Sequence, residues 1–271
     1  MVYEIEVTVI GQEWIYDFFV EKGELFLAYF KLLKERGEKI ARGIAKVLNN
    51  YGVQKVLDMC CGVGRVTIPL VEMGFEVIGI DINPLYIRLA NLEANRRGVS
   101  NKAKFIVGDV RKLIKYMGKY APFDAVLSIW TSIGYFSEID DVVIFKQARK
   151  LVRESGVLII ADTACKESFL WKGPKIKSKD LVQIEDLLII TRSSYDPLTS
   201  RIRAKFSYYK FENKNLKFLG ESEYDVRIYG INEIVKLLKK AGWETRELFS
   251  DFIELKPYEL GKGLNLVAKA I

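Results

Sequence analysis

The chain has 271 residues, 49% of which are hydrophobic, and a formal net charge of +7 at pH 7. This length fits one large α/β domain, or one domain with a sizeable insertion, and provides ample apolar residues for a buried core. The sequence contains no histidine, which is the commonest general base near neutral pH, so much hydrolytic chemistry is excluded.

Further features of the composition limit location and partners. The longest uncharged apolar run, residues 125–137, is too short to span a bilayer, and the acidic N-terminal segment does not resemble a signal peptide. We therefore expect a soluble, cytoplasmic protein without membrane contact. The cysteines, Cys60, Cys61 and Cys165, form no CxxC pattern, so neither a disulfide framework nor a metal site is expected. The positive charge is spread along the chain, as on solvated faces, and a nucleic-acid partner stays open as the alternative.

The first fifty residues predict a helical cap. Residues 14–50 are rich in apolar side chains, and in their second half these fall at i, i+4, i+7 and i+8 on one helix face: Ile40, Ile44, Val47 and Leu48. Gly52 follows at the position where a helix end favours glycine. We therefore assign residues 1–50 to N-terminal helices outside the main sheet.

A regular alternation of strands and helices follows. Strands are predicted at residues 55–59, 75–80, 104–107, 123–130 and 156–162. The second of the intervening helices begins with Asn83 as N-cap and Pro84 at its first position, and Leu85, Leu89 and Leu92 mark its expected buried face. The alternation predicts a doubly wound, Rossmann-like α/β fold with a mostly parallel sheet. Such folds bind ligands outside the carboxyl ends of their strands.

The pattern changes between residues 164 and 228. Three strands are predicted there, at 180–194, 201–211 and 216–227, and we interpret them as an antiparallel sheet inserted over the substrate site. The α/β domain, which begins with residues 51–163, resumes over residues 229–271. Its last part is a helix, with Glu233 placed to reach back to the helix start, and two strands at 244–252 and 264–270, the last of them antiparallel.

The first strand ends in an acid and is followed by the glycine loop CCGVG. Gly62 and Gly64 allow the backbone close to a ligand. A dinucleotide site would have glycine where Thr67 stands, and Asp58 at the strand end opposes a pyrophosphate. The same negative charge suits a ligand with an ammonium group and a sulfonium, such as S-adenosylmethionine. A tight glycine turn without any ligand is the alternative.

Two more acids lie at predicted strand ends. Asp81 follows the second strand, where a carboxylate can accept hydrogen bonds from both ribose hydroxyls or can cap the next helix. Asp109 follows the third strand. Its carboxylate can accept from an adenine amino group, with the Val110 amide addressing a ring nitrogen, or it simply caps the helix that begins near residue 111. Three acids with this order and spacing arise by accident far less readily than one.

The stretch Val56 to Ala90 closely resembles class I S-adenosylmethionine-dependent methyltransferases. Within that class, the motifs DMCCGVG, GFEVIGID and FDAVLSIWTSIGYF look most like the group that contains the glycine and sarcosine N-methyltransferases. The resemblance covers residues 48–162 together with the final helix and strand pair. It is specific for the cofactor and says little about the methyl acceptor. It implies an enzyme that uses S-adenosylmethionine and yields S-adenosylhomocysteine.

The resemblance also implies roles for individual residues. Asp58 and the glycine loop would hold the methionine part of the cofactor, Asp81 the ribose, and Asp109 the adenine. Cys60 stands where the family often has Gly or Ala, and we regard this departure as benign. The implied cofactor-binding residues are Asp58, Cys60, Gly62, Gly64, Asp81, Ile82, which would pack on adenine, Asp109, Val110, and Ile129, whose carbonyl would accept from the ammonium.

The catalytic residues stay unknown at this stage. Methyl transfer is an in-line displacement at an activated carbon, so the protein must mainly hold two reactants in line, and the lack of histidine is no obstacle. Tyr29 and Tyr135 are candidates to line the acceptor pocket, with packing or positioning favoured over a role as base. Residues 129–132, Ile-Trp-Thr-Ser, lack the Asn/Asp-Pro-Pro-aromatic motif that is usual in amino-directed nucleic-acid methyltransferases.

We therefore expect methyl transfer to nitrogen or oxygen of a small molecule. An RNA or protein methyltransferase is the alternative, and a nucleotide-binding oxidoreductase or a non-catalytic binding module follows behind it. The inserted sheet is interpreted as a lid or a dimer surface, so a homodimer stays open. Four arginines in or beside this sheet are surface residues in the simplest interpretation, although one could hold a substrate carboxylate: Arg192, Arg201, Arg203 and Arg227.

Overall fold

The computed structural model describes residues 13–171, 177–213 and 215–271. Its central sheet has the strand order β11-β10-β12-β5-β4-β1-β2-β3. Strands β1 to β5 are parallel to one another, and β12 is antiparallel to both β5 and β10. The predicted doubly wound fold is therefore confirmed. The strands are β1 (Lys55–Met59), β2 (Glu76–Asp81), β3 (Ala103–Val107), β4 (Phe123–Ile129), β5 (Val152–Thr163), β10 (Trp243–Asp251), β11 (Lys256–Pro257) and β12 (Leu264–Ala270).

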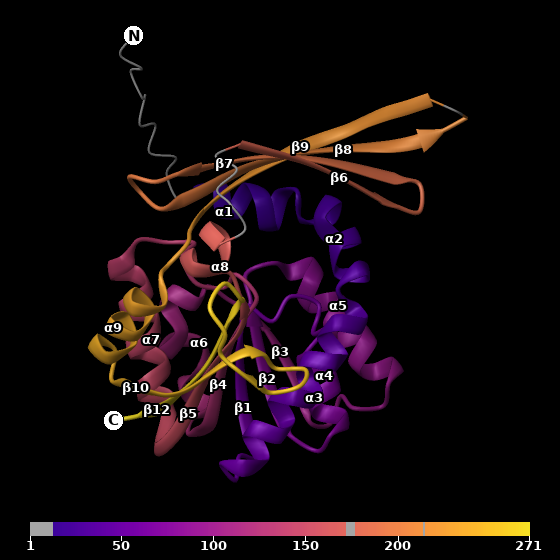
Figure 1. Cartoon of the computed structure of the whole chain (residues 1–271). Coiled ribbons are helices and arrows are strands. Elements are labelled where there is room, and N and C mark those ends of the chain that lie inside the picture. Colours follow the sequence, from indigo (N-terminus) through magenta and orange to yellow (C-terminus); the bar gives the residue numbers. More distant parts are fainter. Residues whose placement is uncertain (1–12, 172–176, 214) are drawn as a thin grey trace.

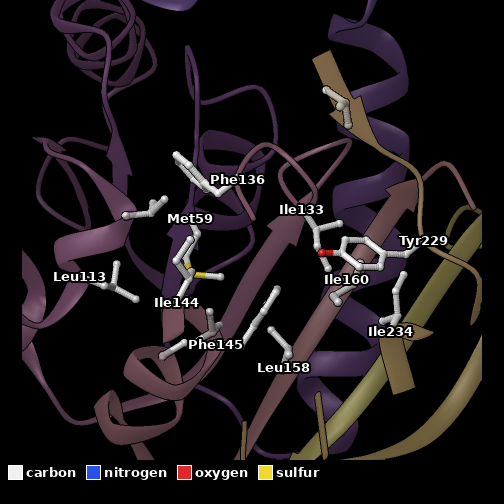
Figure 2. Packing of buried hydrophobic residues seen from close by; sticks show 14 of the residues in the cluster. Met59, Leu113, Ile133, Phe136, Ile144, Phe145, Leu158, Ile160, Tyr229 and Ile234 are labelled. Carbon is white, nitrogen blue, oxygen red and sulfur yellow. The ribbon is translucent and has the colours of Figure 1, made fainter. Parts of the chain in front are cut away.

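Helices cover both faces of this sheet (Figure 1). One face carries α3 (Lys34–Asn50), α4 (Thr67–Glu72) and α5 (Pro84–Arg96), and the other carries α6 (Leu113–Met117), α7 (Glu138–Leu151) and α9 (Ile231–Lys240). Because side chains alternate along a strand, neighbours such as Val56 and Leu57 belong to two different buried clusters. Figure 2 shows the cluster that contains Leu57, in which Phe145 of α7 and Ile234 of α9 pack towards β5.

The start of α5 agrees with the prediction from the sequence, but its buried face does not. Asn83 Oδ1 accepts the Leu85 amide at 2.7 Å, and Pro84 is the first helical residue. The buried residues are Tyr86, Ile87, Ala90 and Ala94, whereas Leu92 is 59% exposed. The expected Leu85–Leu89–Leu92 face is therefore wrong, because two small alanines on the other stripe let the helix lie close to the sheet.

The N-terminal region is a chain of short helices followed by α3. It consists of α1 (Glu13–Tyr16), a π-helical turn η1 (Asp17–Glu21) and α2 (Gly23–Leu32). Figure 1 shows α1 and α2 between the central sheet and the second sheet. No helix within the described residues is both long and apolar enough to cross a membrane. The remaining short helices are η2 (Val110–Lys112), η3 (Gly118–Tyr120) and α8 (Lys166–Trp171).

The second sheet is antiparallel, with the order β6-β7-β8-β9. It contains β6 (Lys177–Ile184), β7 (Leu187–Asp196), β8 (Arg201–Glu212) and β9 (Asn215–Arg227). The sequence predicted three strands, which is wrong, because residues 180–194 form two strands joined by a tight turn. Glu185 takes a φ of 54° in this turn. Tight hairpins usually have Asn or Gly at such positions, and the turn here, Glu185-Asp186, contains neither.

Candidate functional site

A cavity lies at the carboxyl ends of the parallel strands, next to β1 and β4, between which the strand order reverses. We call it the main cavity. Its empty space, including the part open to solvent, is about 820 Å³. Gly64 and Tyr29 do not line it. The sequence-predicted residues that do are Asp58, Cys60, Gly62, Asp81, Ile82, Asp109, Val110, Ile129 and Tyr135.

The glycine loop turns sharply beneath this cavity. Cys60, Gly62 and Gly64 have φ values of 58°, 55° and 77°, a region that non-glycine residues seldom adopt. Gly64 faces the core instead of the cavity, since an added Cβ would lie 3.1 Å from both Ile68 and Phe105. Burial and the charge of Asp81 raise the pKa of the Cys60 thiol, so a thiolate nucleophile is disfavoured there.

Asp58 is almost completely buried at the end of β1. Its Oδ2 accepts a hydrogen bond from the Thr67 hydroxyl at 2.5 Å. Burial raises the pKa of Asp58 to about 7, although Thr67 and the nearby Arg65 act in the opposite direction. A cation in the cavity would favour the ionised carboxylate. In the sequence Thr67 only argued against a dinucleotide site, whereas in the structure it orients Asp58.

Asp81 connects the glycine loop to the start of α5. It accepts the amides of Gly62 and Asn83, each at 2.9 Å. Burial raises the pKa of Asp81, and the backbone hydrogen bonds from Asn83, Gly62 and Ile82 limit the rise. Each carboxylate oxygen accepts one of these two amides and has a second lone pair, so the residue can tether the loop and still accept hydroxyl groups.

Asp109 is engaged by its own neighbour. It accepts the Arg111 amide at 2.9 Å and pairs with the Arg111 guanidinium at 2.6 Å. Burial alone would raise the pKa of Asp109, but the hydrogen bonds from Arg111 outweigh it and lower the pKa. Asp109 therefore caps the following helix, which the sequence analysis gave as the alternative to adenine binding. It also lines the main cavity.

The loop after β4 is fixed by hydrogen bonds to a buried carboxylate. Asp141 Oδ2 accepts the Tyr229 hydroxyl at 2.7 Å and the Gly134 amide at 3.2 Å. Gly134 has a φ of +91°, and an added Cβ would lie only 2.2 Å from the Arg227 carbonyl oxygen. This packing fixes the backbone next to Tyr135, and so the wall of the main cavity.

A second cavity adjoins the main one, and we call it the aromatic chamber. It shares Phe19, Trp130 and Tyr135 with the main cavity, and its empty space is about 790 Å³. Three segments that are distant in sequence build it: the N-terminal helices, the loop after β4, and the second sheet. The lining residues are Phe18, Phe19, Phe26, Tyr29, Trp130, Thr131, Tyr135, Asp180, Thr191, Phe206, Tyr224 and Val226.

Strand pairing explains how the second sheet reaches this chamber. Asp180, Thr191 and Phe206 are direct cross-strand partners on β6, β7 and β8, so they share one face of the sheet. The pKa of Tyr29 is raised by burial and by Asp180, against a hydrogen bond with Thr191. Burial also raises the pKa of Tyr135. Both phenols are therefore protonated near neutral pH.

The four arginines of the sequence analysis line neither cavity. Arg201 and Arg203 pair with Asp225, and Arg227 pairs with Glu138 and Glu233. Arg192 is exposed and opposite Lys179 on the other face of the sheet. The hypothesis that one of them binds a substrate carboxylate is therefore wrong, because three of the four form ion pairs with acidic residues of the protein itself.

Comparison with known proteins identifies the part of the chain around the main cavity. Residues 56–156 match the family model described as a methyltransferase domain. This part is a class I S-adenosylmethionine-dependent methyltransferase domain. It runs from β1 into β5, so it contains the glycine loop and the three acidic strand ends. S-adenosylmethionine is the cofactor of this family.

Relatives of the methyltransferase domain differ in what their names say they act on. A Bacillus subtilis protein named as a candidate methyltransferase, YqeM, is 24% identical over 75% of this chain and 78% of its own length. An uncharacterized RNA methyltransferase of Nostoc sp. is 32% identical, over only 33% of this chain and 19% of its own length.

Solved structures share the fold. The CcbJ methyltransferase from Streptomyces caelestis superimposes with a TM-score of 0.73 at 20% identity, covering 86% of this chain and 89% of that protein. An amino pentose methyltransferase from Micromonospora echinaspora, solved with bound S-adenosylmethionine, has a TM-score of 0.64 at 17% identity, covering 85% and 90%. These likenesses extend beyond the methyltransferase domain into the N-terminal helices or the second sheet, because each covers far more than residues 56–156.

The charges of the main cavity fit S-adenosylmethionine. Buried Asp58 suits a positive group, and Asp81 suits hydroxyls. Arg65, which sequence reasoning missed, also lines the cavity and carries a buried nitrogen that lacks a hydrogen-bond partner among the described residues. The signal was present as a basic residue directly after Gly64 in the glycine loop. The aromatic lining of the chamber was missed for another reason, since its residues come from three separate segments.

Proposed function

We propose that the enzyme transfers a methyl group to nitrogen or oxygen of a small molecule that binds in the aromatic chamber. The observation that carries the proposal is that the two cavities adjoin: Phe19, Trp130 and Tyr135 line both of them. Because the two cavities adjoin at these residues, a donor in the main cavity and an acceptor in the aromatic chamber can approach each other in line where the cavities meet, which is the main requirement of the reaction. The likeness to an amino pentose methyltransferase supports an acceptor of this size.

In this proposal the residues of the main cavity hold the methyl donor. S-adenosylmethionine supplies a methyl group on a positive sulfonium. Asp58 and the Ile129 carbonyl hold the ammonium, Asp81 the ribose hydroxyls, and Ile82 packs on adenine. The Ile129 carbonyl already accepts the Ser132 hydroxyl at 2.7 Å and has a second lone pair for the ligand. Val110 and Asp109 face the adenine.

The residues of the aromatic chamber orient the acceptor and exclude water. Ring faces attract positive charge, so Trp130 and Tyr135 stabilise the sulfonium end of the donor. The protonated phenols of Tyr29 and Tyr135 can donate hydrogen bonds to the accepting molecule. With the pKa of both raised, they position the acceptor and do not take its proton.

A chamber-filling substitution tests this function. Thr191→Phe adds bulk inside the chamber, and Leu181→Phe adds it on the opposite face of the same sheet, where Leu181 is 62% exposed. Both variants should bind S-adenosylhomocysteine as the wild type does. Formation of S-adenosylhomocysteine with a panel of small amines and hydroxyl compounds should be lost in Thr191→Phe and kept in Leu181→Phe. Methylation of RNA or protein that both variants retain would contradict the proposal and favour a macromolecular acceptor.

A further inference from the structure

The lining of the aromatic chamber carries one charged side chain. Of the twelve described residues that line the chamber, eight are aromatic, and Asp180 is the only acidic or basic one. The chain as a whole has a formal net charge of +7, so a general attraction of cations to the protein is not expected. The chamber is therefore a local negative site on a positively charged protein, and its walls are aromatic.

Asp180 lies at the end of the chamber that does not adjoin the methyl donor. It does not line the main cavity, whereas Trp130 lines both cavities. From Trp130 a row of stacked rings leads through Phe26 to Tyr29, with successive ring centres 6.0 Å and 5.0 Å apart. Tyr29 forms a hydrogen bond with Thr191, the cross-strand partner of Asp180. One end of the chamber thus adjoins the main cavity, and the other end carries the carboxylate.

The carboxylate and the rings favour the same kind of ligand group. Asp180 is exposed on β6, so an ion pair with its carboxylate alone would contribute little to binding. Aromatic rings attract organic cations as well, and the two effects add. Burial raises the pKa of Tyr29 and the charge of Asp180 adds to the rise, so this charge acts inside the chamber. A carboxylate offers about four acceptor positions, so Asp180 can serve a partner in the protein and a ligand together.

We propose that the methyl acceptor is a cationic amine, with its ammonium group beside Asp180 and its accepting nitrogen or oxygen at the opposite end, next to Trp130 and Tyr135. This rests on the proposed function, in which the chamber holds the acceptor, and it names the class of substrate. A neutral acceptor would leave the charge of Asp180 unused, and an acidic one would be repelled by it.

Two probes of the same shape test the recognition of charge. They are acetylcholine and 3,3-dimethylbutyl acetate, which has a carbon in place of the quaternary nitrogen, and neither carries an N–H or O–H group that could be methylated. Calorimetry uses protein saturated with S-adenosylhomocysteine, so that Asp58 in the main cavity does not attract the cation. The wild type should bind acetylcholine on the order of tenfold more tightly than the neutral probe. Asp180→Asn should weaken acetylcholine binding about threefold to fivefold and leave the neutral probe unaffected.

The matched control is Asp186→Asn, the same substitution in the turn between β6 and β7, where Asp186 pairs with Lys210. It should keep both wild-type affinities. Both variants should bind S-adenosylhomocysteine as the wild type does, which shows that the fold and the donor site are intact. Equal affinities of the wild type for the two probes, undetectable binding of acetylcholine, or an affinity that Asp180→Asn leaves unchanged would overturn the proposal.

Competition separates this proposal from the proposed function. Acetylcholine should inhibit methyl transfer to the small-molecule acceptors of the wild type, and the inhibition should be weaker in Asp180→Asn. Equal inhibition by the neutral probe would support the chamber as the acceptor site and contradict a cationic acceptor. Acetylcholine that binds through Asp180 without inhibiting methyl transfer would instead contradict the proposed function, because the acceptor would then bind elsewhere.

Discussion

Asp58 should make cofactor binding depend on pH near neutrality. Its pKa is raised by burial to about 7, and we expect the ammonium of the ligand to bind the ionised form. The ionised fraction then rises from about one tenth at pH 6 to about nine tenths at pH 8, so the affinity for S-adenosylhomocysteine should increase about tenfold over this interval. Binding at pH 7 should release roughly half a proton per ligand, because the bound state holds Asp58 ionised.

Without ligand, the stability of the protein should change with pH in the direction opposite to the affinity. A carboxyl group whose pKa is higher in the folded than in the unfolded protein costs stability once it ionises. The free energy of unfolding should therefore fall as the pH rises from about 4 to about 7. Asp58→Asn should remove this contribution, while the amide oxygen of the substituted side chain can still accept a hydrogen bond from Thr67. The variant without ligand should thus be at least as stable as the wild type at pH 8, as measured by its melting temperature.

Calorimetry at pH 6, 7 and 8 in buffers of different ionisation enthalpy measures both affinity and proton release. 5′-Methylthioadenosine, which lacks the ammonium, should show little pH dependence and serves as the ligand control. Asp186→Asn is the matched protein control, since Asp186 is an exposed acid paired with Lys210. A tenfold change that persists in Asp58→Asn, or that is equally large for 5′-methylthioadenosine, would refute the assignment of the ammonium to Asp58.

Three further predictions concern other parts of the site. Asp81→Ala should weaken S-adenosylhomocysteine binding by roughly 1–3 kcal/mol, and unchanged affinity with an intact fold would count against the ribose role. Gly134→Ala should lower the free energy of unfolding by about 1–3 kcal/mol, because its Cβ would lie 2.2 Å from a carbonyl oxygen. Gly52→Ala, at a φ of +63° but with no atom within 4 Å of the added Cβ, should lower it by less. Equal denaturation midpoints for the two variants would contradict the packing argument. Tyr135→Phe should change turnover by no more than several-fold, whereas a loss of about 10²–10⁴-fold, typical of a missing general base, would show that Tyr135 takes the acceptor's proton.

The sequence alone determined the central sheet and the places of its acidic strand ends. Strands alternating with helices leave few topologies, because crossover connections between parallel strands are right-handed, and the carboxyl ends of parallel strands then meet at one edge. The positions of Asp58, Asp81 and Asp109 around one cavity follow from that local pattern. Single strands such as Lys55–Met59 were predicted accurately for the same reason, since a short apolar run between turn residues is a local signal.

The tertiary structure decided what local patterns cannot encode. Thr67 orients Asp58 across the glycine loop, Arg65 is enclosed by α3 and Trp130, and the turn at Glu185 contains neither Asn nor Gly. The buried face of α5 depended on which stripe fits closely against the sheet, and not on which stripe is more hydrophobic. The aromatic chamber needs three segments that approach each other only after folding. Packing and burial depend on contacts between residues far apart in the chain, and it is these contacts that fix the chamber and the charges around it.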